Sequence, residues 1–123
     1  MALTQTSRRC LLLLLVVPAL LSAAPRPQEI RREFTVDAKK YAFTPARIEV
    51  EEGDVVRITL IAADIPHSFT IDDYRIAKRD EPGKPVAFEF LANRAGTFKF
   101  YCNLTIDDGC KRMAGDLVVT KKR

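Results

Sequence analysis

From residue 30 to the C-terminus, the sequence is a series of short segments in which apolar and polar residues alternate. A period of two places the apolar side chains on one face of a strand, so each segment buries one face. Glycine and proline residues separate the segments, and no stretch shows the 3.6-residue period of an amphipathic helix. This pattern predicts an all-β fold, a Greek-key β-sandwich. The expected strands cover residues 30–36, 48–51, 55–61, 67–71, 85–92, 96–102 and 115–121.

The first 24 residues differ from the rest and are expected to be an export signal. Arg8 and Arg9 precede an apolar run at residues 10–21, and small residues follow. This is the layout of a secretory signal peptide, and the run is shorter than the roughly 20 residues that a transmembrane helix needs. We therefore expect a signal peptide or short anchor at residues 1–24, a linker at 25–29 and one domain at 30–123. The domain would be periplasmic or otherwise exported, and held at a membrane only if the N-terminal segment is retained.

Charge and motif content argue against two classes of function. The chain has 20 basic and 16 acidic residues that are interleaved along the sequence, which gives no support to nucleic-acid binding. The sequence contains no glycine-rich phosphate loop, and its single histidine would have to serve as the base for any thiol nucleophile. We therefore do not expect an enzyme. The charged segment at residues 72–84 and the pair Asp107 and Asp108 are expected to lie in solvated loops.

Beyond the expected signal, the chain has four soft or imidazole ligands for a metal, namely His67, Cys102, Cys110 and Met113. Three of them lie between the last two expected strands, and His67 lies at the start of a different strand. Copper prefers imidazole and thiolate ligands with a weak axial thioether. A rigid β-frame that brings the two loops together would suit such a site. The alternative is a disulfide between Cys102 and Cys110, worth about 2–3 kcal/mol in an oxidising compartment.

Three stretches of the sequence carry a family resemblance: DIPHSFTIDDYRI, PGKPVAFEFLANRAGTFKFYC and MAGDLVV. They resemble a cupredoxin, and more narrowly the binuclear-copper (CuA) domain of cytochrome c oxidase subunit II. The ligand loop of that family reads C-x-x-x-C-x-x-x-H-x-x-M, with an earlier histidine at the end of another strand. The resemblance implies a cupredoxin β-sandwich that binds copper.

Carried over position by position, the family pattern fits this sequence only in part. His67 matches the early histidine, Cys102 the first cysteine and Met113 the methionine. Ile106 stands where the family has its second cysteine, and Cys110 stands where it has its second histidine. A binuclear centre needs two bridging thiolates and one imidazole for each copper, and an ordinary blue-copper site needs two histidines. The departures therefore leave a site for one copper ion.

The expected function is one-electron transfer in an exported compartment with a redox partner protein. His67 would be the imidazole donor, Cys102 the main thiolate, Cys110 the second thiolate and Met113 the weak axial ligand. Because two thiolates favour Cu(I), a Cu(I) chaperone or store that passes copper to an accepting protein is the first alternative. A metal-free binding module with a Cys102–Cys110 disulfide is the second alternative.

Overall fold

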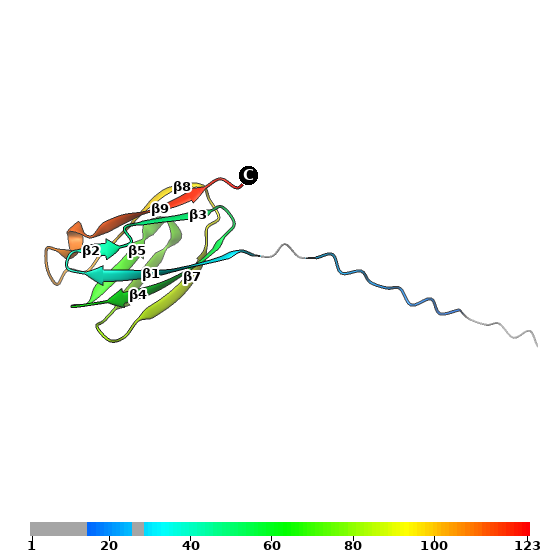
Figure 1. Cartoon of the computed structure of the whole chain (residues 1–123), viewed down its shortest axis with the longest axis horizontal. Coiled ribbons are helices and arrows are strands. Elements are labelled where there is room, and N and C mark those ends of the chain that lie inside the picture. Colours follow the sequence, from blue (N-terminus) through cyan, green and yellow to red (C-terminus); the bar gives the residue numbers. More distant parts are fainter. Residues whose placement is uncertain (1–14, 26–28) are drawn as a thin grey trace, which may run out of the picture.

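The structure, a computed structural model, describes residues 15–25 and 29–123. Residues 1–14 of the expected signal and 26–28 of the expected linker lie outside this range. Residues 15–25 form neither helix nor strand, and their side chains are exposed (Figure 1). Within the described ranges, no helix has the length and apolar character required to cross a membrane.

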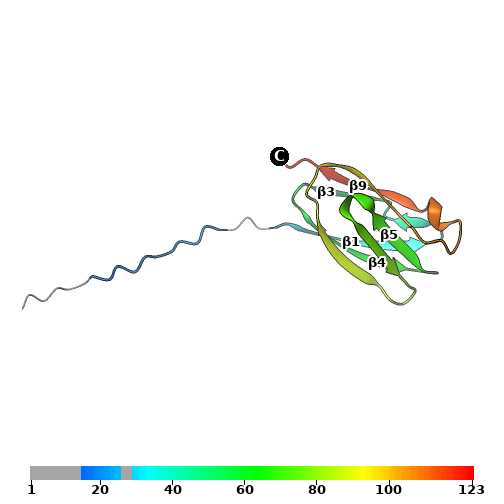
Figure 2. The same cartoon turned by 180° about the vertical axis from the view of Figure 1, so that it is seen from behind.

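Nine strands in the described residues form two sheets that pack face to face (Figures 1 and 2). One sheet has four strands in the order β2-β1-β4-β7, and the other has five in the order β3-β9-β8-β5-β6. The pairs β1–β4 and β3–β9 are parallel, and the remaining pairs are antiparallel. The predicted all-β sandwich is confirmed. The strands are β1 (Arg31–Lys39), β2 (Ala42–Thr44), β3 (Arg47–Glu51), β4 (Val55–Ala62), β5 (His67–Ile71), β6 (Ile76–Asp80), β7 (Val86–Leu91), β8 (Gly96–Tyr101) and β9 (Ala114–Thr120).

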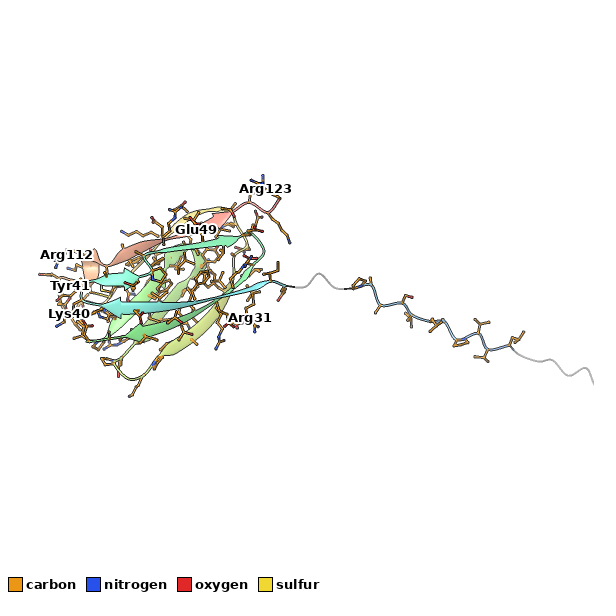
Figure 3. All side chains as sticks on the ribbon, viewed as in Figure 1. Arg31, Lys40, Tyr41, Glu49, Arg112 and Arg123 are labelled. Atoms are coloured by element: carbon orange, nitrogen blue, oxygen red, sulfur yellow. A yellow bond between two sulfur atoms is a disulfide. The ribbon has the colours of Figure 1, made fainter. Side chains whose placement is uncertain are left out.

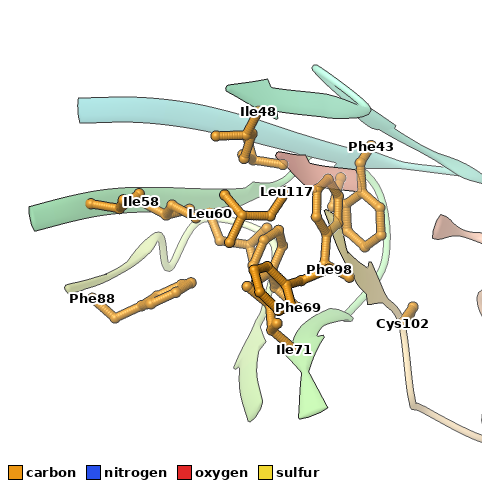
Figure 4. Close-up of a cluster of buried hydrophobic side chains, with 14 of the residues drawn as sticks. Phe43, Ile48, Ile58, Leu60, Phe69, Ile71, Phe88, Phe98, Cys102 and Leu117 are labelled. Atoms are coloured by element: carbon orange, nitrogen blue, oxygen red, sulfur yellow. The ribbon is translucent and has the colours of Figure 1, made fainter. Parts of the chain in front are cut away.

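The core between the sheets is built from the apolar positions of the alternating segments. Aromatic rings lie at its centre, where the rings of Phe69 and Phe100 stack with their centroids 4.6 Å apart. Phe43 meets both rings edge-on, at 5.8 and 5.4 Å (Figure 4). These contacts hold the middle of β5 against the end of β8, because Phe69 is the central residue of β5 and Phe100 is the second-last residue of β8.

The charged segment at residues 72–84 is not the loop that was expected. It contains a single 3₁₀ turn, η1 (Asp72–Tyr74), followed by strand β6, which pairs with β5 from Ile71↔Ile76 to His67↔Asp80. β6 is an edge strand, so most of its charged side chains face solvent, and charged residues on an edge also discourage pairing with other chains. Strand β6 was missed because its residues are mostly charged and do not show the alternation of apolar and polar residues on which the prediction was based. The short strand β2 was also not predicted.

Candidate metal centre

His67 is the first residue of β5, and its side chain is only 1% exposed. The ring nitrogen Nε2 donates a hydrogen bond to Oδ1 of Asp64, at 2.8 Å. The other ring nitrogen, Nδ1, is buried and has no hydrogen-bond partner among the described residues. In a neutral imidazole whose Nε2 carries the proton, Nδ1 has a free lone pair. The structure thus presents one buried, unused nitrogen donor at this end of the sandwich.

Asp64 holds the histidine ring in this orientation. Its carboxylate also accepts hydrogen bonds from the backbone amides of Lys40, at 2.8 Å, and Ile65, at 2.7 Å. Burial opposes ionisation of Asp64, but the hydrogen bonds from Lys40, His67 and Ile65 outweigh it and lower the pKa of the carboxyl from 3.8 to about 2. Asp64 is therefore negatively charged at neutral pH and accepts the Nε2 proton.

Cys102 follows β8 directly, and its sulfur forms a disulfide with Cys110. The Cα atoms of the two residues are 5.2 Å apart, and both side chains are buried. The backbone amide of Ser68 donates a hydrogen bond to Sγ of Cys102, at 3.4 Å. Because Ser68 adjoins His67 in β5, this contact places the Cys102 sulfur beside the backbone that carries the histidine.

Met113 connects the two cysteines through its backbone. Its amide donates to the carbonyl of Cys110, at 3.1 Å, and its carbonyl accepts from the amide of Cys102, at 3.2 Å. The Met113 side chain is fully buried. The structure thus gathers Cys102, Cys110 and Met113 at the end of the sandwich where β5 begins with His67.

The segment before Met113 forms a compact turn, η2 (Cys110–Arg112), and the Asp107 side chain contacts its first residue. Oδ1 of Asp107 accepts the amide proton of Cys110, at 3.0 Å, and Oδ2 accepts from the hydroxyl of Tyr41, at 3.3 Å. Gly109 packs so tightly under the Tyr41 ring that a Cβ atom there would overlap it. Figure 3 shows Tyr41 and Arg112 at this same end of the molecule. Asp107 is therefore a structural residue, whereas Asp108 is exposed as predicted.

Three residues near the cysteines and the histidine were not predicted from the sequence: Asp64, Ser68 and Asp80. Asp64 carries a signal that could have been used, because it lies three residues before His67. Ser68 acts through its backbone amide, for which the sequence gives no signal. Asp80 ends β6, pairs directly with His67 across the sheet and is 1% exposed. Burial raises the pKa of Asp80, although the nearby His67 ring lowers it in part.

A family model for the cupredoxin-like domain matches residues 11–119 of the sequence. The chain belongs to the cupredoxin-like family. This match confirms the resemblance drawn from the sequence motifs. No curated protein sequence matches the chain significantly.

Solved structures of other cupredoxin domains share the fold. A heme-copper terminal oxidase dimer aligns with a TM-score of 0.68 and 20% identity, over 85% of this chain and 80% of that chain. The periplasmic domain of subunit II of cytochrome oxidase (CoxB) of Bradyrhizobium japonicum aligns with a TM-score of 0.65 and 16% identity, over 73% of this chain and 84% of that one. A Cu-containing nitrite reductase (NirK) from Thermus scotoductus aligns with a TM-score of 0.64 and 25% identity, over 76% of this chain but only 28% of that one. The fold is thus one found in several copper proteins.

In the disulfide form, the described part of this cupredoxin has no group of three or more His, Cys, Asp or Glu side chains arranged to hold a metal ion. A thiolate is a metal ligand, whereas a disulfide sulfur is not. The remaining donors still suit copper, since Nδ1 of His67 is buried and unused and the sulfurs lie at the same end of the fold. Copper binding by the two cysteines would therefore require reduction of the Cys102–Cys110 bond.

Proposed function

We propose that this cupredoxin is exported and binds one copper ion through His67, Cys102, Cys110 and Met113 when the disulfide is reduced. The observation that carries the proposal is the buried Nδ1 of His67, which has no hydrogen-bond partner among the described residues. The next residue along the strand, Ser68, donates its backbone amide to the Cys102 sulfur. Leaving a buried acceptor unsatisfied costs about 1–3 kcal/mol. A bound metal would use this lone pair.

The residue behind the histidine supports the same proposal. Metal-binding histidines almost always donate their second ring N–H to a carboxylate or carbonyl, which fixes the tautomer and strengthens the donor nitrogen. Asp64 accepts the Nε2 proton at 2.8 Å and is itself held by two backbone amides. Nδ1 is thereby kept free and pointed into the protein.

The cysteines make the site dependent on redox conditions. Reduction of the disulfide by an external dithiol, which supplies two electrons and two protons and is itself oxidised to a disulfide, would yield two thiols. Their thiolates, together with the Met113 thioether, are soft donors. Such donors select Cu(I), and the metal would supply either a transferable ion or a one-electron redox couple. The oxidised protein would not bind copper, and the reduced protein would bind it.

Of the two uses of this site, binding and delivery of Cu(I) has the stronger support. Cys102 and Cys110 lie close enough to form a disulfide, and Cu(II) oxidises thiolate pairs whereas Cu(I) does not. One-electron transfer is the second candidate, favoured by the rigid placement of His67 through Asp64 and the β5 backbone. A copper-accepting protein would be the partner in the first case, and a redox protein in the second.

The experiment is an anaerobic titration of reduced and oxidised protein with Cu(I), in competition with a chromophoric chelator. We expect one Cu(I) per chain in the reduced protein and none in the disulfide form. Colourless, tight Cu(I) binding supports delivery, whereas a coloured and reversibly reducible Cu(II) form supports electron transfer. Absence of binding in the reduced protein would contradict the proposal and leave the metal-free binding module.

Two variants test the ligand assignment. In the Cu(II) form, Cys102→Ser should remove most of the thiolate-to-copper absorption, and an undiminished band would assign it to Cys110 alone. Cys110→His should restore a blue-copper-like set of two imidazoles and one thiolate, with an intense visible band. An unchanged spectrum in Cys110→His would argue against Cys110 as a ligand.

A further inference from the structure

Asp80 is a buried carboxylate without a partner. Its side chain is 1% exposed, and neither carboxylate oxygen accepts a hydrogen bond within the described structure. Asp80 forms no salt bridge within the described residues. Lys78 and Arg79 precede it on the same strand, but their side chains are exposed, whereas that of Asp80 is buried. A buried carboxylate in this position is unfavourable unless a proton or a cation compensates it.

The register of the sheet places Asp80 next to one of the proposed ligands, His67. Asp80 lies directly opposite His67 in the antiparallel pair of β5 and β6. Residues opposite each other in such a pair project from the same face, with their Cβ atoms about 4.5–5.5 Å apart. The unpaired carboxylate therefore stands beside the imidazole whose Nδ1 is also unpaired.

We propose that Asp80 is an oxygen donor to the metal held by His67 and the sulfurs, and that it shifts the preference of the site from Cu(I) toward a divalent ion. This inference rests on the proposed function. The chain has a single histidine, so no second imidazole is present to bind the oxidised metal. Carboxylate oxygen is a harder ligand than thiolate or thioether, so it contributes more to a divalent ion than to Cu(I).

The test compares Asp80→Asn with the wild-type protein, both fully reduced and without oxygen. Co(II) serves as the divalent probe, since it does not oxidise thiols under these conditions and its visible bands report its coordination. We expect Asp80→Asn to weaken Co(II) binding by about 10–100-fold and to change its visible bands. Cu(I) affinity, measured by chelator competition, should change less than about threefold, because soft donors dominate that binding.

Glu81→Gln is the matched control, because Glu81 adjoins Asp80 but has a side chain 49% exposed beside Lys84. It should change neither affinity. Equal Co(II) affinity and equal bands in Asp80→Asn and the wild type would overturn the inference and leave the proposed function intact. Failure of the reduced wild type to bind either ion would instead overturn the proposed function itself.

A measurement on the wild type keeps the inference testable if Asp80→Asn does not fold. X-ray absorption at the cobalt edge counts nitrogen and oxygen neighbours separately from sulfur. With one histidine in the chain, we expect at least two such light neighbours. A single light neighbour would overturn the assignment of Asp80.

Discussion

Strands β4 and β5 lie on opposite sides of the same core, and they are built differently. Along β4, buried residues alternate with half-buried ones from Val55 to Ala62. All five residues of β5 are buried, although His67, Ser68 and Thr70 are polar. β4 thus has the ordinary pattern of a strand that contributes one face to a core, whereas β5 is covered on both faces.

Two of the three polar residues of β5, His67 and Ser68, form side-chain hydrogen bonds with residues outside the strand, whereas Oγ1 of Thr70 has no partner among the described residues. Ser68 donates its hydroxyl proton to Asn103 and accepts the amide proton of Asn103, both at 2.7 Å. His67 is oriented by Asp64, and the Ser68 amide is used by Cys102. The difference is that β4 contributes only apolar side chains to the core, whereas β5 adds to the core and also carries the buried polar residue His67 of the proposed site.

The largest expected effect is a loss of stability when a core side chain of β4 is shortened. Leu60→Ala in β4 removes a fully buried side chain and should lower the free energy of unfolding by about 2–5 kcal/mol. Chemical denaturation measures this loss, and Cu(I) affinity of the folded fraction should stay within about twofold of the wild type. A loss below about 1 kcal/mol would show that β4 is not a principal source of stability.

A smaller loss of stability is expected when the disulfide in the loop between β8 and β9 is reduced. Reduction of the Cys102–Cys110 disulfide should lower the free energy of unfolding by about 2.5 kcal/mol, because the closed loop is short. Cys110→Ser without reductant should lose a similar amount, and reductant should have no further effect on this variant. Equal stability of oxidised and reduced wild-type protein would contradict the role of the bridge.

The smallest effect concerns the residue that orients His67. The pKa of Asp64 is about 2 in the folded protein against 3.8 in the unfolded chain, so its stabilising effect is fully present above about pH 4 and is lost as the pH falls through about 2. Asp64→Asn should therefore cost about 2 kcal/mol at pH 7 in the metal-free disulfide form. Denaturation of variant and wild type should give converging stabilities near pH 2.

Asp108→Asn is the control for this prediction, since the Asp108 side chain is 93% exposed. It should leave the pH profile of stability unchanged. A constant difference between Asp64→Asn and the wild type down to pH 2 would contradict the assigned pKa.

The sequence predicted the parts of the fold that follow a simple physical rule. Alternation located β4 and β5 to within one residue at each end, because each side chain in those strands either enters the core or does not. β6 was missed, because an edge strand with one neighbour can keep its charged residues in solvent. For the same reason, nothing in the charged run distinguished buried Asp80 from its exposed neighbours.

The positions of the candidate donor residues could be predicted from the sequence. Whether the two cysteines are thiols or a disulfide could not. His67 and Cys102 could be placed because each lies at a strand end. Whether Cys102 and Cys110 are bridged depends on the distance between two residues in a loop, and their spacing allows both a metal site and a disulfide. The structure contains the disulfide, and the ligand roles remain a proposal.

The most direct test of the central claim is nitrogen NMR of the His67 ring. Since His67 is the only histidine in the chain, its two ring nitrogens give signals that need no further assignment to a residue. Addition of one equivalent of Cu(I) to the reduced protein should shift the Nδ1 signal strongly, while Nε2 remains protonated and bonded to Asp64. If neither nitrogen responds, or if Nε2 responds in place of Nδ1, the proposed copper site is wrong.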